Sequence, residues 1–198
     1  MRNVPLRACA TPVAIGAWIA AVAAGMFQVW NYEMTTGHIG GVAARWPVDS
    51  ALPFESDRAR LLLFAHPRCP CTRASIEELA RLLTQCGDRP VAIVVFLQPD
   101  GVDVAWVRDA LWRRSFEIPQ VRAVIDPGGR EQARFGVHTS GHVLLYDREG
   151  ILVFSGGITA ARGHEGANAG AAAIADWYRH GTADVSETPV FGCSLSTP

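Results

Sequence analysis

Two cysteines that lie one residue apart carry the most distinctive chemistry in this sequence. Cys69 and Cys71 flank Pro70 in the segment HPRCPCT, residues 66–72. A thiolate is the species that attacks disulfides and binds soft metal ions, so the pair predicts either redox exchange or metal binding. A disulfide between them would close a smaller ring than the spacing C-x-x-C allows, and we expect the strain to make it a better oxidant.

The predicted elements around the pair place it at the start of a helix. Residues 60–65, RLLLFA, predict a buried strand, and residues 72–83, TRASIEELARLL, repeat apolar side chains at helical spacing. Pro70 suits the first helical turn, because its missing N–H would be unpaired there anyway. Cys69 then lies near the N-cap and Cys71 just inside the helix, where free N–H groups and the helix dipole favour a thiolate.

The residue types predict a division of roles among the thiols. Arg68 and Arg73 flank the pair and would favour the thiolate further. We predict Cys69 as the attacking thiol, because the cap position is the more exposed, and Cys71 as the resolving thiol; the reverse assignment stays open. Cys193 ends the C-terminal stretch PVFGC, whose aromatic residue could dock on the fold and bring a third thiol. A free thiol with no role is the alternative.

The rest of the chain alternates apolar runs and helical patterns. We expect strands at 91–97 and 121–125 and helices at 104–113 and 166–179. A short helix that ends near residue 136 follows the second of these strands. Residues 143–146 and 151–154 predict a hairpin with Gly150 in its turn. Parallel crossovers followed by an antiparallel edge predict an α/β sheet with helices on both faces. Ligands gather beyond the carboxyl ends of such parallel strands, where the cysteine pair lies.

The N-terminal region predicts a membrane span. Between Arg7 and Glu33 there are 25 uncharged residues, and the densest part is 13–30. As a helix that part is about 27 Å long, close to the hydrocarbon thickness of about 30 Å. Arg2 and Arg7 precede it, so we expect a single-pass inner-membrane protein, a signal anchor with its N-terminus in the cytoplasm and the rest in the periplasm. A cleaved signal peptide, cut near the small residues 21–25, is the rival.

Composition divides the chain and excludes one class of partner. We expect a cytoplasmic stub and anchor at 1–32, a glycine- and proline-containing tether at 33–57, a domain at 58–180 and a cysteine-containing tail at 181–198. The net charge is −1 and no basic block is present, so we expect membrane lipid as a partner of the anchor and no nucleic acid.

The sequence resembles the thioredoxin superfamily. Within it, the chain is similar to the membrane-tethered extracytoplasmic thiol-disulfide oxidoreductases of bacterial envelopes, with a C-x-C motif. The resemblance covers about residues 58–180 and is carried by LLLFAHPRCPCTRASIEEL, VRAVIDPGGREQARFGV and HVLLYDREGILVFSGG. It implies a thioredoxin-like mixed sheet flanked by helices, preceded by the one transmembrane helix.

The resemblance also implies a site and shows two departures from the family pattern. If Pro70 and Cys71 align with the family's Pro-Cys, Arg68 takes the usual place of the attacking cysteine. The loop that normally carries a cis-proline opposite the cysteines falls at 138–142, with Gly141 where proline is expected. The residues expected to line the site are His66, Pro67, Arg68, Pro70, Arg73, Ser140, Gly141 and His142.

Three functions follow as alternatives. The resemblance implies thiol-disulfide exchange through Cys69 and Cys71, without a cofactor, on an envelope protein that carries a cysteine pair. The second is binding or delivery of Cu(I) or Zn by Cys69, Cys71, His66 and His142, because sulfur and imidazole are the ligands these ions prefer. The third is a redox-inert scaffold whose cysteines are structural.

Overall fold

A computed structural model describes residues 6–86 and 90–195 of the chain, which divides into two units. The units are Met1–Thr35 and Thr36–Pro198. The first contains one helix, α1 (Leu6–Met34). Its segment Thr11–Met34 has a mean hydropathy of 1.7 and is, among the described helices, the one long and apolar enough to cross a membrane. Its large apolar side chains, such as Trp18 and Phe27, are exposed.

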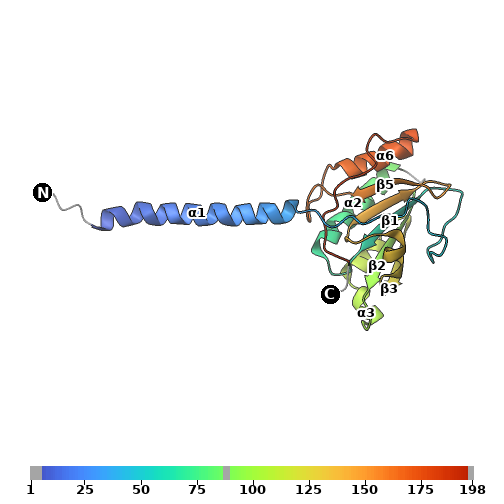
Figure 1. Cartoon of the computed structure of the whole chain (residues 1–198), viewed down its shortest axis with the longest axis horizontal. Helices are drawn as coiled ribbons and strands as arrows, with labels where there is room; N and C mark the ends of the chain where they lie inside the picture. The colour runs from blue at the N-terminus through green and yellow to red at the C-terminus, as the bar shows by residue number, and fades with distance from the viewer. Residues whose placement is uncertain (1–5, 87–89, 196–198) are drawn as a thin grey trace. The chain divides into compact units, whose positions relative to one another are not determined.

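The second unit is built on one mixed sheet of five strands (Figure 1). The strands are β1 (Arg60–Ala65), β2 (Val91–Gln98), β3 (Val121–Pro127), β4 (His142–Tyr146) and β5 (Leu152–Gly157), in the order β3-β2-β1-β4-β5. The first three are parallel, whereas β4 runs antiparallel to β1 and β5 antiparallel to β4. The chain therefore has the thioredoxin-like mixed sheet predicted from its sequence.

Helices cover the sheet unequally on its two faces. They are α2 (Pro70–Cys86), α3 (Val104–Val107), α4 (Ala110–Phe116), α5 (Arg130–Phe135) and α6 (Ala169–His180). The helices α2 and α6 pack on one face through side chains such as Leu79 and Ile174. On the other face, Phe135 at the end of α5 packs against Phe64 and Leu144. The second face therefore has less helical cover, and non-helical segments pack on it instead.

The segment predicted as a tether at 33–57 differs from that expectation. From Thr36 onward it belongs to the folded unit. Leu52 is buried in the second face, and Trp46 packs edge-on against Phe135 and Tyr146, with ring centroids 5.1 and 5.4 Å away. The physical reason is the sheet face left uncovered by α5, which the apolar side chains of this segment shield from water.

The tail expected at 181–198 also packs on the fold as far as it is described. Val190 and Leu195 are 0% and 1% exposed, and Phe191 is also buried. Glu187 forms a parallel bridge with Ser155 of β5, and Ser194 an antiparallel bridge with Thr139. The tail therefore runs from the edge of the sheet to the loop that precedes β4.

The single helix predicted at 104–113 is two short helices. Asp103 caps α3 by accepting a hydrogen bond from the Ala105 N–H at 2.6 Å. Asp109 caps α4 in the same way, accepting from the Ala110 N–H at 2.8 Å. An aspartate that binds the backbone at a helix start competes with continuation of the preceding helix, so Asp109 divides the predicted element.

Candidate functional site

Three thiols meet at the start of α2. Cys69 precedes the helix, Pro70 is its first residue, and Cys71 lies in its first turn, as the sequence predicts. The tail brings Cys193 to the same place from 124 positions further along the chain, and the Sγ atoms of Cys69 and Cys193 lie 2.8 Å apart. The Cys71 side chain also contacts that of Cys69. Cys69 is therefore the central thiol of the cluster.

The tail changes the expected exposure of these thiols. Cys69 is only 1% exposed and Cys71 6%, whereas Cys193 is half-buried. The expectation that Cys69 is the more exposed of the adjacent pair is wrong for this structure. The reason is that the tail, which approaches from far along the chain, lies against Cys69.

Ser140, in the loop before β4, makes hydrogen bonds to both the cysteine loop and the tail. Its backbone N–H donates to the Cys193 carbonyl at 2.8 Å. Its Oγ accepts a hydrogen bond from the His66 N–H at 2.8 Å and lies 2.6 Å from the hydroxyl of Thr72 in the first turn of α2. Because Ser140 and Thr72 are both buried, these bonds hold the loops at a fixed separation.

Two glycines allow the close approach of these segments. Gly141 has φ +88 and donates its N–H to the Phe64 carbonyl at 2.8 Å. A proline at this position would have no N–H to donate. No cis peptide occurs among the described residues. In the tail, a Cβ on Gly192 would lie 1.8 Å from the Ser140 carbonyl oxygen, so the tail requires glycine there.

The hydrogen bonds between thiols separate their acidities. Burial raises the pKa of Cys69, but hydrogen bonds with Cys193 and Thr72 outweigh it, and the net pKa is lowered. Burial and the neighbouring Cys69 raise the pKa of Cys71. The same two causes raise the pKa of Cys193 to about 12. A negative charge in the cluster is therefore most stable on Cys69, while the neighbouring thiols stay protonated.

Arg162 lies beside the thiols, and nothing in the sequence connects it with the cysteine motif. Its Nη1 donates to the Gly192 carbonyl at 2.7 Å. Its positive charge lowers the pKa of both Cys71 and Cys193. Arg162 lies between β5 and α6, far from the cysteine motif in sequence, and the only local signal is an arginine beside glycine in a polar loop.

The residues of the cysteine loop differ in burial and in the contacts they make. Pro67 is buried, whereas Pro70 is exposed. The half-buried ring of His66 accepts a hydrogen bond at Nδ1 from the Arg68 N–H at 3.2 Å and packs edge-on against Trp106. Burial, then the charge of Arg68, lowers the pKa of His66. The exposed Arg68 places its guanidinium 4.7 Å from the centroid of the Trp106 ring.

Arg73, the other arginine that flanks the cysteine pair, acts on a carboxylate of α2. The hydrogen bond with Arg114 lowers the pKa of Glu77, and the charge of Arg73, exposed on α2, adds to this effect. The salt bridge of Glu77 with Arg114, at 2.7 Å, joins α2 to α4. The arginine beside the thiols is thus Arg162, at a position remote in sequence.

His142 lies in β4 and not beside the thiols. Its Nε2 is 2.8 Å from the Ser155 hydroxyl, and the side chain is fully buried. Alternation along β4 places it on the face of Leu144, whereas Val143 points to the face that α2 covers. Burial, and then the charge of His138, lowers the pKa of His142 to about 4.

A metal site finds little support in these positions. Across residues 11–86 and 90–195, no three His, Cys, Asp or Glu side chains are arranged to hold a metal ion. His142 lies on the face of Leu144 with its Nε2 at Ser155, and His66 uses Nδ1 to accept from the backbone. The expected ligand set of two cysteines and two histidines is therefore not brought together in the described part of the chain.

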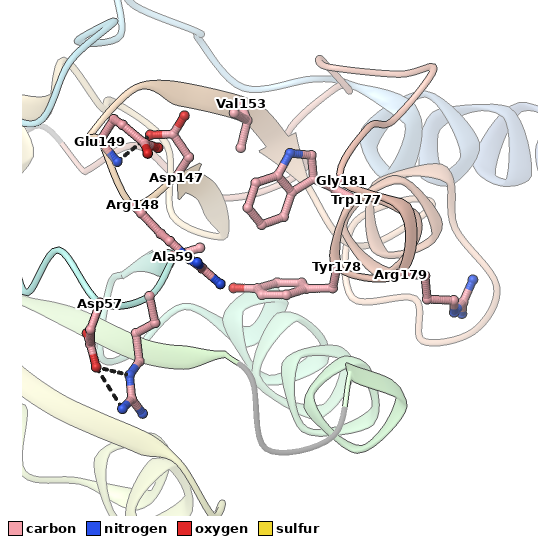
Figure 2. Close-up of a pocket in the computed structure, with 11 residues that line it drawn as sticks. Asp57, Ala59, Asp147, Arg148, Glu149, Val153, Trp177, Tyr178, Arg179 and Gly181 are labelled. Atoms are coloured by element: carbon pink, nitrogen blue, oxygen red, sulfur yellow. Dashed lines mark hydrogen bonds and ion pairs between the residues drawn. The ribbon is translucent and has the colours of Figure 1, made fainter.

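A separate pocket lies at the other end of β1 (Figure 2). It has a volume of about 790 Å³ and is lined by residues that include Arg58, Asp147, Arg148, Trp177 and Tyr178. Beside the pocket, Arg58 Nη2 forms an ion pair with Asp57 Oδ2, and these two atoms are 2.8 Å apart. The pocket adjoins Ala59 before β1, whereas the cysteine loop follows β1, so it is not part of the thiol cluster.

Comparison with known proteins shows the fold. No family model and no curated protein matches the sequence. A hypothetical protein of Sinorhizobium meliloti 1021 is 18% identical and matches with a TM-score of 0.57 over 81% of this chain and 95% of its own. An uncharacterized conserved protein of Geobacillus kaustophilus is 16% identical, with a TM-score of 0.59 over 83% of this chain and 93% of its own.

A third similar structure is the pneumococcal exposed lipoprotein thioredoxin of Streptococcus pneumoniae strain TIGR4. It is 19% identical, with a TM-score of 0.46 over 63% of this chain and 85% of its own. At identities this low, structural likeness speaks to fold, and function has to be inferred from the site itself.

Proposed function

We propose that this protein exchanges disulfides with cysteine-containing proteins through Cys69. The observation that carries the proposal is the 2.8 Å contact between the sulfur atoms of Cys69 and Cys193 at the N-terminus of α2. Thiols that only fill a core need neither this proximity nor hydrogen bonds that lower the pKa of one of them. The cluster supplies the two thiols that one round of exchange requires.

The reaction follows from the chemistry of a dithiol. A thiolate attacks one sulfur of a disulfide, forms a mixed disulfide and releases a thiolate; a second thiol then resolves the mixed disulfide. When this protein is the reductant, two of its thiols lose two electrons and the client disulfide becomes two thiols; the oxidant direction is the reverse. Cys69 takes part in either direction, with Cys71 or Cys193 as its partner.

The compartment is part of the proposal. The helix α1 supports a single membrane anchor, and Arg2 and Arg7, which precede its apolar segment Thr11–Met34, favour a cytoplasmic N-terminus. The folded unit would then face the periplasm, where disulfides persist. The clients are envelope proteins with a cysteine pair, and exchange among thiols needs no cofactor.

Exchange by the full-length protein in detergent tests this function. We expect it to catalyse reduction of a protein disulfide by dithiothreitol, or the reverse oxidation by glutathione disulfide, and Cys69→Ser to lose this activity. Cys86→Ser is the matched control, because Cys86 lies at the opposite end of α2. Activity of Cys69→Ser equal to that of the Cys86→Ser control would contradict the proposal.

A further inference from the structure

We propose that Cys69 and Cys193 form the redox-active disulfide of this protein, and that Cys193 is the sulfur which the client attacks. This assignment rests on the proposed thiol-disulfide function and names the partner of Cys69. It differs from the pairing of Cys69 with Cys71 expected from the sequence. Proximity, the seating of the tail and unequal exposure carry it.

Proximity favours Cys193 as the partner of Cys69. The two sulfur atoms are 2.8 Å apart, and a disulfide bond is about 2.05 Å long, so a small shift of the tail brings them to bonding distance. Cys71 is confined to the first turn of α2, two positions from Cys69, where a bond would close a small ring. The tail meets no such constraint, because it reaches Cys69 from a distant part of the chain.

The tail is seated at this place by contacts on both sides of Cys193. Before it, the Gly192 carbonyl accepts from Arg162 at 2.7 Å. At Cys193 itself the carbonyl accepts from the Ser140 N–H at 2.8 Å. After it, the Leu195 N–H donates to the His138 carbonyl, also at 2.8 Å. These three hydrogen bonds to backbone atoms of the tail hold the Cys193 thiol in a defined position.

Unequal exposure assigns a role to each sulfur. Cys69 is 1% exposed and lies beneath the tail, whereas Cys193 is half-buried and open in part to solvent. A thiolate from another protein must approach a disulfide sulfur directly, so Cys193 is the accessible target. Cys69 is then the leaving group.

The acidity of Cys69 supports this direction. Hydrogen bonds with Cys193 and Thr72 outweigh the effect of burial and lower the pKa of Cys69. A thiol of lower pKa leaves faster in disulfide exchange. When the client attacks Cys193, that sulfur no longer carries a proton to donate, so the hydrogen bonds with Thr72 are those that still stabilise the released Cys69 thiolate.

The electrons balance over one cycle. A client thiolate attacks Cys193 Sγ, the bond between Cys69 and Cys193 breaks, and Cys69 takes the electron pair. The second client thiolate then attacks the client sulfur of the mixed disulfide and releases Cys193 as a thiolate. The client has lost two electrons and this protein has gained them. A disulfide of another protein, or glutathione disulfide in the test tube, restores the bond between Cys69 and Cys193.

Disulfide mapping of the full-length protein tests the pairing. After oxidation with glutathione disulfide, alkylation and non-reducing digestion, we expect mass spectrometry to find the Cys69–Cys193 peptide as the dominant link. Cys71→Ser should keep this link, Cys86→Ser should match the wild type, and Cys193→Ala should lose it entirely. A dominant Cys69–Cys71 link in the wild type would overturn the pairing while leaving the exchange function of Cys69 intact.

A monothiol probe tests which sulfur is attacked. Glutathione added briefly to the oxidised protein, followed by an acid quench, should appear on Cys193, with Cys69 recovered as the free thiol in at least about tenfold excess over the reverse product. Glutathione found mainly on Cys69 overturns the assignment of roles. If the Cys69–Cys193 link forms but the protein exchanges no disulfide with a protein client, the proposed function is contradicted and the pairing is not.

Discussion

The hydroxyl groups of Ser140 and Thr72 lie 2.6 Å apart, and this contact joins the loop before β4 to the first turn of the cysteine helix. Ser140 also holds the tail through the Cys193 carbonyl. Ser140 therefore contributes to the spacing between Cys69 and Cys193 through both its side chain and its backbone N–H. The predictions that follow concern the parts of this arrangement and its attachment.

Ser140→Ala should weaken the fold and loosen the thiol cluster. It removes the hydroxyl that binds Thr72 and the His66 N–H, and leaves both without that partner in a buried place. We expect a loss of about 1–3 kcal/mol in the free energy of unfolding, measured by urea denaturation. Ser56→Ala, at an exposed position, should stay within about 0.5 kcal/mol of the wild type. Equal stability of the two variants would show that the Ser140 contacts contribute nothing.

Gly192→Ala should displace the tail. The added Cβ would lie 1.8 Å from the Ser140 carbonyl oxygen, which is backbone and cannot move aside. We expect the Cys69–Cys193 link to fall several-fold after oxidation, and Cys69 in the reduced protein to react faster with iodoacetamide because its cover is lost. Gly41→Ala is the matched control, since its Cβ would meet nothing within 4 Å. Unchanged linkage in Gly192→Ala would mean that the tail seats differently.

Arg162→Met should shift the acidity of two thiols in a defined direction. The charge of Arg162 lowers the pKa of Cys71 and of Cys193, and its loss should raise both. Alkylation of each cysteine, followed by peptide mass spectrometry across pH, should therefore require a higher pH for the same rate. Arg179→Met removes an exposed arginine that pairs with Asp176 at 2.7 Å, and should leave the alkylation profiles in place.

Stability should fall in acid because of His142. Burial lowers the pKa of His142 from 6.5 to about 4, so the unfolded chain binds a proton that the folded chain excludes between these values. Stability is therefore present above pH 6.5 and is lost as the pH falls toward 4, by at most about 3 kcal/mol. Urea denaturation at several pH values should show a shallower loss in His142→Gln than in the wild type.

The matched control for this measurement is His180→Gln, at an exposed position at the end of α6. It removes a histidine without disturbing a buried hydrogen bond. A pH profile of His142→Gln that is as steep as that of the control would assign the acid sensitivity to other groups.

Deletion of α1 should release the folded unit from the membrane. The unit that starts at Thr36 contains the whole sheet and the thiol cluster, whereas the apolar side chains of α1 are exposed. We expect the full chain to remain in alkali-washed membranes and a chain that begins at Thr36 to remain soluble. N-terminal sequencing of the mature protein decides between an anchor and a cleaved signal: a new N-terminus near residues 21–25 would contradict the anchor.

Much of the fold follows from local patterns in the sequence. The apolar runs at 60–65 and 91–97 predict β1 and β2, and Gly150, at φ +74, occupies the hairpin turn where the sequence places it. The position of Pro70 predicts a helix start between the two cysteines, as observed. These features depend on the conformational preferences of neighbouring residues, which the sequence states directly.

The thiol cluster could be predicted only in part, because its geometry joins segments that are distant in the chain. Sequence alone determined a C-x-C pair at a helix N-terminus and an apolar segment that can cross a membrane. Tertiary structure decided that the tail passes Ser140 and brings Cys193 onto Cys69, that Arg162 lies beside the thiols, and that His142 faces the other side of the sheet. No periodicity encodes such meetings, since they depend on strand order and on which surfaces remain uncovered after the sheet has formed.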